Sequence, residues 1–128
     1  MIIAVDFDGT CTTHEYPEIG RDIGAEPVLK KLSAAGHSLI LWTMRSDRYL
    51  EDAVQWFKAR DIPLYGINSN PTQKEWTNSP KAYAHLYIDD AALGIPLCMP
   101  MNADERPFVN WQAVELMLAP LLEPGEEG

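Results

Sequence analysis

The segment that decides the fold is Ile2–Thr10, which reads Ile-Ile-Ala-Val-Asp-Phe-Asp-Gly-Thr. Its first five residues, Ile2–Asp6, are mostly β-formers, and they predict a short strand that is ended by Gly9. Residues two apart in an extended strand lie on the same side, so the carboxylates of Asp6 and Asp8 leave this strand together. Gly9 lets the backbone turn without a Cβ clash and should expose N–H groups to a ligand. A strand end with solvated acids and a turn glycine is the purely structural interpretation of the same pattern.

Strand-like and helix-like stretches alternate along the rest of the chain. Further strands are predicted at Leu39–Thr43, Leu64–Ile67 and Leu86–Asp89, with a short fifth strand near Pro96–Met99. Apolar residues at helical spacing predict helices over Pro27–Ala35, over Arg48–Arg60 and after Asn110. Ser46 and Asn110 are predicted to be N-caps, and Gly36 to stop the first helix. This alternation predicts an α/β fold, a three-layer Rossmann-like parallel sheet with helices on both faces.

The predicted topology brings polar side chains from separate strands together. Right-handed crossovers put the carboxyl ends of parallel strands at one edge of the sheet, where ligands of open α/β sheets bind. The first strand ends at Asp6, the second at Thr43, and the fourth at Asp89 and Asp90. We therefore expect these four side chains to share one crevice.

Length and composition limit the kind of protein. The chain has 128 residues, of which 46% are hydrophobic, and predicts one domain over residues 1–122 with a flexible acidic tail over residues 123–128. A net charge of −9 disfavours nucleic acid as a partner. The apolar run at the N-terminus stops at Asp6, too short for a signal peptide, and no run is long enough to span a bilayer. Cys11 and Cys98 have no metal-ligand spacing. A cytoplasmic protein without membrane partners is expected.

Four segments in order resemble the motifs of the haloacid dehalogenase-like (HAD) superfamily. Asp6-Phe7-Asp8-Gly9-Thr10 is similar to its first motif, Asp-x-Asp-x-Thr, and Leu39–Thr43 to its second, an apolar strand ending in Thr or Ser. Lys81 resembles the lysine of the third motif, and Leu86–Asp90 resembles the fourth, a strand that ends in an acidic pair. The resemblance covers nearly the whole predicted domain. Lys74 is the alternative to Lys81, and Thr43 has an alternative interpretation as an ordinary strand residue.

The resemblance implies catalysis through an aspartyl-phosphate. Asp6 would be the nucleophile, and Asp8 would protonate the leaving oxygen and then deprotonate the hydrolytic water. Thr43, Lys81 and exposed backbone N–H groups, for which the turn at Gly9 and Thr10 is the candidate, would bind the phosphoryl group. An acid at position 8 favours a phosphatase or phosphotransferase, because dehalogenases lack this acid and P-type ATPases carry a threonine there.

The same resemblance implies Mg²⁺ as the cofactor. Its ligands would be Asp6, the backbone carbonyl of Asp8, Asp89, and Asp90 either directly or through a water. A hard cation of this kind prefers carboxylate and carbonyl oxygens, and it would offset the charge of an anion attacking a phosphate dianion.

The stretches between the motifs are too short for a cap domain, which indicates a substrate site that no such domain covers. HAD enzymes insert a cap domain either over the stretch Cys11–Ser38 or over Met44–Pro80 of this chain, and neither holds a further domain. A capless member is therefore expected, whose crevice a large phosphorylated substrate or a neighbouring subunit of a homo-oligomer would cover. Arg45 and His14 are candidate substrate-binding residues, although Arg45 equally fits a solvated loop arginine.

The expected function is a Mg²⁺-dependent phosphomonoester hydrolase acting on a phosphorylated small molecule or on an exposed phosphate of a larger one. One alternative is a phosphotransferase on the same fold, which would need a means of keeping water off the aspartyl-phosphate. Another is a catalytically idle phosphate-binding or interaction module. Loss of Asp6, Asp8 or Lys81 would favour that module, and all three are present.

Overall fold

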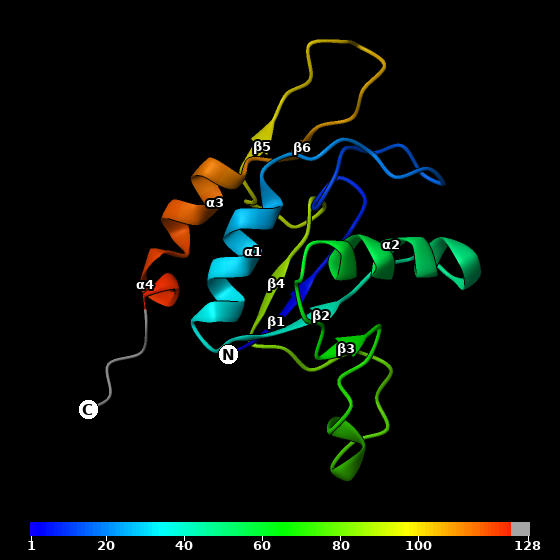
Figure 1. Cartoon of the computed structure of the whole chain (residues 1–128), viewed down its shortest axis with the longest axis vertical. Helices are drawn as coiled ribbons and strands as arrows, with labels where there is room; N and C mark the ends of the chain where they lie inside the picture. Colours follow the sequence, from blue (N-terminus) through cyan, green and yellow to red (C-terminus); the bar gives the residue numbers. More distant parts are fainter. Residues whose placement is uncertain (124–128) are drawn as a thin grey trace.

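The described residues of the chain, 1–123, form a mixed α/β structure in the computed structural model (Figure 1). The predicted flexible tail over residues 123–128 lies outside these residues except for Glu123. The elements in chain order are β1 (Ile2–Val5), α1 (Ala25–Ala34), β2 (Ser38–Leu41), α2 (Asp47–Ala59), β3 (Gly66–Ile67), the 3₁₀ turn η1 (Gln73–Glu75), β4 (Leu86–Ile88), β5 (Leu97–Cys98), β6 (Phe108–Val109), α3 (Trp111–Met117) and α4 (Ala119–Leu122).

A parallel sheet of four strands forms the centre of the molecule. Its order is β3-β2-β1-β4, and all three pairings are parallel. The register places Val5 of β1 beside Leu41 of β2 and Ile88 of β4. All three strands therefore end at the same level of the sheet, as the sequence predicted, and the next residues of each strand lie at one edge.

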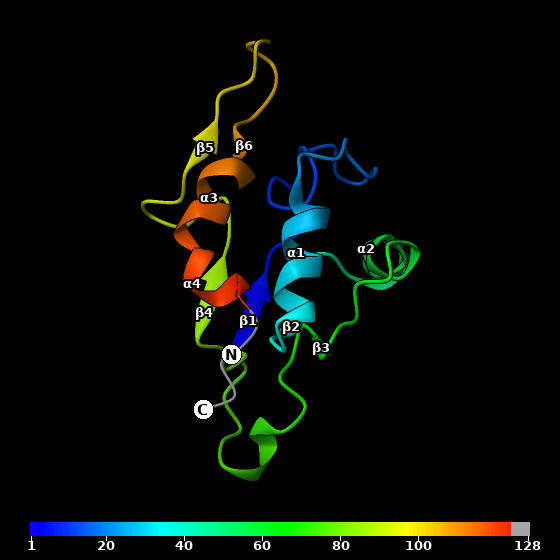
Figure 2. The ribbon, with the colours of Figure 1, turned by 60° about the vertical axis from the view of Figure 1, so that its left-hand side comes forward.

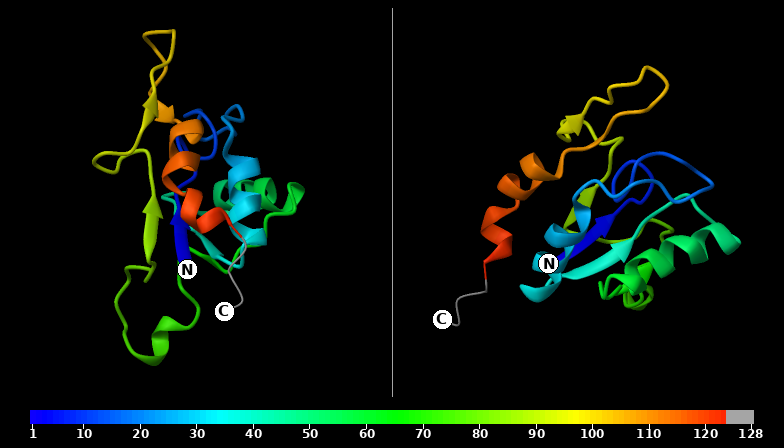
Figure 3. Two further views of the ribbon diagram at one scale, coloured as in Figure 1. Left: turned by 90° about the vertical axis from the view of Figure 1, so that its left-hand side faces the viewer. Right: turned by 45° about the horizontal axis from the view of Figure 1, so that its top comes forward.

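The helices pack on one face of this sheet. Ile3, Val5, Leu39 and Leu41 share that face and belong to one buried cluster. The cluster also takes in residues of α1, α2 and α3 and Leu118, among them Leu29, Phe57 and Trp111. The edge-on view shows the helices together on this side (Figure 3, left), and the second orientation shows α1 beside α3 and α4 (Figure 2). Within residues 1–123 no α-helix covers the other face, so the prediction of helices on both faces is wrong for that face.

The opposite face is covered by the connection between β3 and β4. Ala4 and Ile40 lie on this face and are fully buried. The hydroxyl of Tyr87, on the same face, donates a hydrogen bond to the carbonyl of Ala82 at 2.6 Å. The buried side chain of Gln73 holds the connection together, donating to the carbonyls of Ser79 and Lys81 and accepting from the amide of Tyr83. In a crossover helix the backbone N–H and C=O groups would pair with one another. In this connection the side chain of Gln73 bonds several of these groups instead.

The structure confirms two of the three predicted helix ends in full and the third only in position. Gly36 has a φ of 93° and donates to the carbonyl of Ser33, which confirms it as the stop of α1. Asn110 Oδ1 accepts from the amide of Ala113, which confirms the cap of α3. Ser46 occupies the predicted N-cap position of α2, but its side chain makes no capping hydrogen bond. Asp47 begins α2 with a φ of 53°, outside the helical geometry that a capping hydroxyl requires.

A small antiparallel ribbon completes the fold. The predicted fifth strand is present as β5, but it pairs with β6 and not with the parallel sheet. The loop between β5 and β6 extends away from the body of the molecule (Figure 2). The amide of Val109 in β6 donates to the carbonyl of Gly9, and the indole N–H of Trp111 donates to the carbonyl of Thr10. The C-terminal elements thereby fix the turn after β1. Among residues 1–123, no helix has the length and apolar character needed to cross a membrane.

Candidate active site

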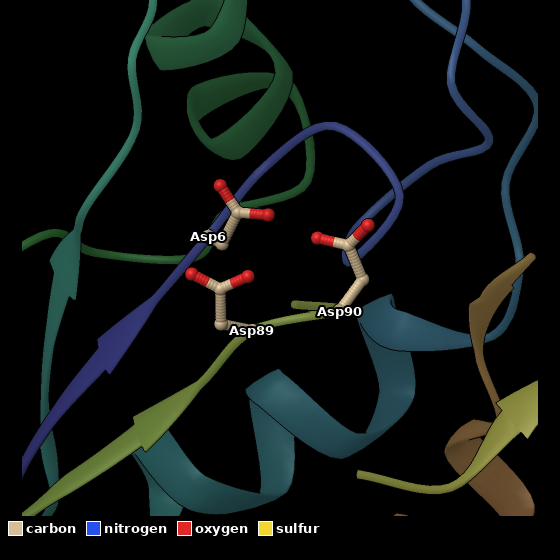
Figure 4. Close-up of side chains that lie close together, drawn as sticks. All are labelled: Asp6, Asp89 and Asp90. Carbon is tan, nitrogen blue, oxygen red and sulfur yellow. The ribbon is translucent and has the colours of Figure 1, made fainter. Parts of the chain in front are cut away.

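Three aspartates meet at the carboxyl ends of β1 and β4, and Figure 4 shows their side chains close together. Asp6 follows β1, whereas Asp89 and Asp90 follow β4. One carboxylate oxygen from each residue lies within 4.8 Å of the others. The predicted convergence of these acids is therefore confirmed, and its cause is the parallel pairing of β1 with β4.

The three carboxyl groups do not titrate alike. Burial, the nearby Asp90 carboxyl and the charge of Asp89 raise the pKa of Asp6 from 3.8 to about 8. Burial and the neighbouring Asp90 also raise the pKa of Asp89. Burial, the largest single influence, would raise the pKa of Asp90 as well, but the hydrogen bonds with His14, Asp6 and Asp89 and the charge of His14 together outweigh it, so this pKa is lowered. Such crowded oxygen donors are the ligand set that a hard divalent cation prefers, and its charge would relieve their repulsion.

Thr10 orients two of these acids. Its side chain is fully buried, and its hydroxyl donates to Asp6 Oδ2 at 2.9 Å and accepts from the amide of Asp90 at 3.0 Å. The hydroxyl therefore links the end of β1 to the end of β4. The prediction that Thr10 binds the substrate is wrong for its side chain, because a fully buried hydroxyl that is engaged in this way cannot reach a ligand.

Position 9 requires glycine because no space is left for a Cβ atom. An exposed backbone amide is not the reason. Gly9 has a φ of 82°, and a Cβ atom there would lie 2.0 Å from His14 Nε2 and 2.6 Å from Asp90 Oδ2. Its N–H donates to the carbonyl of Thr12, and the N–H of Thr10 donates to the carbonyl of Phe7. The expectation that these two amides face a ligand is therefore wrong, since the turn itself uses them.

His14 lies beside the acidic cluster. Its Nε2 atom is 2.7 Å from Asp90 Oδ2, and its side chain is 14% exposed. The loop after β1 thus returns to the metal-ligand candidates, and substrate binding by His14 stays a prediction. Cys11, in the same loop, is buried and donates from its thiol to the carbonyl of Asp6. Burial raises the pKa of this thiol, which fits packing and not nucleophilic chemistry.

Arg45 holds Asp8 and does not face the cleft. Its side chain is 1% exposed, and the guanidinium forms a two-point pair with Asp8, with Nε to Oδ2 and Nη2 to Oδ1 both at 2.8 Å. The remaining hydrogen bonds go to the backbone carbonyls of Pro17, Glu18 and Tyr49. The prediction of a substrate-binding arginine at the rim is wrong, and so is its alternative, a solvated loop arginine.

Two aromatic rings explain why this arginine is buried. The rings of Phe7 and Tyr16 each lie 5.1 Å from the Arg45 guanidinium carbon. Cation–π contacts of this kind favour a planar guanidinium over a compact ammonium. Arg45 therefore joins the Asp8 turn, the loop at Pro17 and the first turn of α2 into one unit.

Replacing Arg45 with methionine should destabilise the protein. The substitution leaves the carboxylate of Asp8 and three carbonyls without their donor, and breaking such a buried pair costs about 3–5 kcal/mol. Urea denaturation followed by circular dichroism measures this loss. The matched control is Arg48→Met. Among the described residues, exposed Arg48 contacts just the side chain of Tyr49, so this replacement should change stability by less than about 1 kcal/mol. Equal effects of the two substitutions would contradict the role assigned to Arg45.

A hollow of about 340 Å³ opens beside Asp6. Its walls are Asp6, Trp42, Thr43, Met44, Asn68 and Asp89. The Thr43 hydroxyl accepts from the amide of Arg45 at 3.2 Å, which leaves its own proton available to a bound oxygen. The structure thus places Thr43 with two of the acids, as predicted from the strand ends.

Lys81 lies in the neighbouring part of the site. A second hollow, of about 280 Å³, is lined by Lys81 together with Asp89, Trp42 and Tyr87. Lys74 instead lines a different hollow, which includes none of the three clustered aspartates. The geometry therefore favours Lys81 over Lys74 as the lysine of this site.

Asn68 lines the same hollow as Thr43, although no sequence pattern had marked it as a candidate. Its Oδ1 atom accepts from the amide of Thr43 at 2.8 Å, and its backbone has a φ of 52°. Asparagine tolerates this left-handed conformation better than most residues. The available signal was its place directly after β3, at the same edge as the other polar strand ends. Trp42 was missed as well, because a tryptophan in an apolar strand is typical of a core residue.

The chain is similar to a protein of known structure. No protein-family model matches the chain, and no curated protein matches it. A solved structure, described as the conserved protein coded by locus from Bacteroides thetaiotaomicron, matches with a TM-score of 0.76 and 36% sequence identity. The match covers 94% of this chain and 90% of that one. At this identity and coverage, the chain belongs to the same family as this conserved Bacteroides protein.

Proposed function

We propose that the protein is a divalent-metal-dependent phosphomonoesterase of the capless HAD type. The observation that carries the proposal is the convergence of Asp6, Asp89 and Asp90, with Thr43 at the same hollow and Lys81 at the next. A carboxylate nucleophile needs neighbours that neutralise a phosphate dianion, and this part of the molecule offers a lysine, a hydroxyl and a cluster of candidate cation ligands.

The proposed reaction has two displacements. In the first, a carboxylate oxygen of Asp6 attacks phosphorus, and the bond from phosphorus to the leaving oxygen breaks while Asp8 gives that oxygen a proton. In the second, Asp8 takes a proton from a water whose oxygen attacks the aspartyl-phosphate. The bond between phosphorus and Asp6 then breaks, which releases inorganic phosphate and restores both carboxyl groups.

Asp6, Asp89 and Asp90 would hold the cation. Their three carboxylates suit Mg²⁺, which binds through a few carboxylates and keeps several waters. The bound cation would supply positive charge opposite the developing charge on the phosphoryl oxygens. Thr10 would keep Asp6 in place for both of its roles, because its hydroxyl already fixes one oxygen of that carboxylate.

Asp8 would transfer protons while its carboxylate stays hydrogen-bonded to Arg45. The two-point pair fixes the plane of its carboxylate, which favours a reproducible position for proton transfer. Poorer leaving groups depend more on receiving the proton from Asp8, so their esters should turn over more slowly.

The direct test is phosphate release. The purified protein should hydrolyse p-nitrophenyl phosphate in a buffer that contains Mg²⁺, and the release of p-nitrophenolate measures the rate. A panel of phosphomonoesters extends the test to other leaving groups. Absence of phosphate release from every member of the panel, with folded protein and Mg²⁺ present, would overturn the proposed function.

The assignment of the lysine is tested by a matched pair of variants. Lys81→Ala should lower kcat/KM for p-nitrophenyl phosphate by about 100-fold or more, because it removes a charge that stabilises the transition state. Lys74→Ala should change it by less than about threefold, since Lys74 lines a hollow apart from the acids. Steady-state kinetics on both variants measure these values. The reverse order of effects would refute the choice of Lys81.

A further inference from the structure

The cleft beside Asp6 is walled by aromatic and apolar side chains that the proposed reaction does not use. Trp42 lines both the 340 Å³ hollow and the 280 Å³ hollow, and Asp89 is common to both. At the first hollow Met44 is 98% exposed, so its side chain has no packing role in the core. An exposed methionine beside a cluster of carboxylates is an apolar contact surface next to the reacting atoms.

The aromatic surface continues beyond Lys81. A third hollow, of about 330 Å³, shares Lys81 and Tyr87 with the second and adds Trp76 and Tyr83. Trp76 is 64% exposed and Tyr83 42% exposed, and their ring centroids lie 5.4 Å apart in an edge-to-face arrangement. Neither ring belongs to the buried core. The three hollows thus form a series from Asp6 to Trp76 with an aromatic ring in each.

The negative charge along this series lies at one end, and one cation follows it. Among the described residues that line the three hollows, the acids are Asp6 and Asp89, and Lys81 is the cation. Lys81 Nζ lies 5.4 Å from the centroid of the Tyr87 ring, between the acidic end and Trp76. One phosphate near Asp6 fits this distribution. A polyanion does not, because single-stranded nucleic acid needs a track of cations along its backbone.

We propose that this cleft selects phosphomonoesters whose organic part carries a neutral ring, with Trp42 as the surface on which that ring stacks. The inference rests on the proposed phosphomonoesterase function and names its substrate class. The flat faces of aryl rings and of sugar rings share the chemistry that an aromatic wall recognises. Met44 would cover a second side of the ring.

Three primary-alcohol esters test the proposal, because their leaving groups differ little in chemistry. They are benzyl phosphate, glucose 6-phosphate and the acyclic glycerol 3-phosphate, each assayed with Mg²⁺. The wild-type protein should hydrolyse at least one ring ester with kcat/KM about tenfold above that of glycerol 3-phosphate. The better ring ester identifies the source of the ring as aryl or sugar.

Substitutions at Trp42 link this preference to the cleft. Trp42→Ala should lower kcat/KM for the preferred ring ester about tenfold more than for glycerol 3-phosphate, and Trp42→Phe should restore most of the preference. Leu93→Ala is the control, since exposed Leu93 lines none of the three hollows, and it should keep the wild-type ratio.

If p-nitrophenyl phosphate is hydrolysed, three results would overturn the ring preference and leave the proposed phosphomonoesterase function standing. These are equal efficiency on all three esters, an equal loss on all of them in Trp42→Ala, or a higher efficiency on a single-stranded hexanucleotide with a terminal phosphate. If p-nitrophenyl phosphate and the whole panel are not hydrolysed, the proposed function and this inference fall together.

Discussion

Asp6→Asn should lower kcat/KM for p-nitrophenyl phosphate by about 10⁴-fold or more, the scale on which enzymes lose activity with their nucleophile. The amide keeps the size of the side chain, and its oxygen still accepts from the Thr10 hydroxyl. What it lacks is a carboxylate oxygen that attacks phosphorus. Steady-state kinetics measure the loss, and circular dichroism checks that the variant is folded.

The same substitution should stabilise the metal-free protein at alkaline pH. The raised pKa of Asp6 shows that its ionised form is unfavourable in the folded state, owing to burial and the charges of the neighbouring acids. Asparagine removes that charge, so the Tm of metal-free Asp6→Asn at about pH 8.5 should exceed that of the wild type. A loss of activity together with a gain in stability is the signature of an acid that serves function and not folding.

Asp52→Asn is the matched control for these measurements. Asp52 lies exposed on α2, and its replacement should leave kcat/KM and Tm close to the wild-type values. Near-wild-type turnover in Asp6→Asn would remove Asp6 as the nucleophile. If Asp52→Asn lost as much turnover as Asp6→Asn, the cause would be a general loss of charge or of folded protein.

The candidate residues whose convergence the sequence predicted correctly stand at strand ends. Strand periodicity locates the last buried residue, and parallel pairing then brings Asp6, Thr43, Asp89 and Asp90 to one edge whatever the loops do. The positions of the strands along the chain followed from local apolar patterns in the same way, although β3 is shorter than predicted. These features depend on residues close together in sequence.

What the sequence did not predict depends on contacts between distant residues. Arg45 is buried because two rings and three backbone carbonyls from separate segments surround its guanidinium, and no local pattern encodes that meeting. The amides of Gly9 and Thr10 are occupied by the closing of their own turn. The second face of the sheet is covered by a connection that Gln73 stabilises through side-chain hydrogen bonds, which leave no helical or strand periodicity to read.

Removal of divalent metal should abolish activity. With EDTA in excess, hydrolysis of p-nitrophenyl phosphate should fall to below about 1% of the rate in Mg²⁺, since an anionic attack on a phosphate dianion would then lack its neutralising charge. Asp89→Asn should show a similar loss at low Mg²⁺ concentration. Hydrolysis that continues unchanged in the chelator would contradict the metal requirement.

The metal should also change how stability depends on pH. Asp6 and Asp89 have raised pKa values in the folded protein, that of Asp6 from 3.8 to about 8. An acid of this kind favours folding fully below its unfolded pKa, and its contribution is lost as pH rises to the folded value. The lowered pKa of Asp90 acts in the opposite direction, but at lower pH. The Tm of the metal-free protein should therefore fall between about pH 5 and about pH 8.5.

Bound Mg²⁺ should reverse this fall, because the cation stabilises the ionised carboxylates that repel one another without it. Scanning calorimetry at the two pH values, with Mg²⁺ and with EDTA, should give a larger increase in Tm at the higher pH, where fewer protons compete with the cation. Asp6→Asn should reduce both the fall and its reversal. A metal-free protein whose Tm does not change over this range, or whose Tm ignores Mg²⁺ at about pH 8.5, would mean that the three carboxylates do not form the cation site on which the proposed chemistry depends.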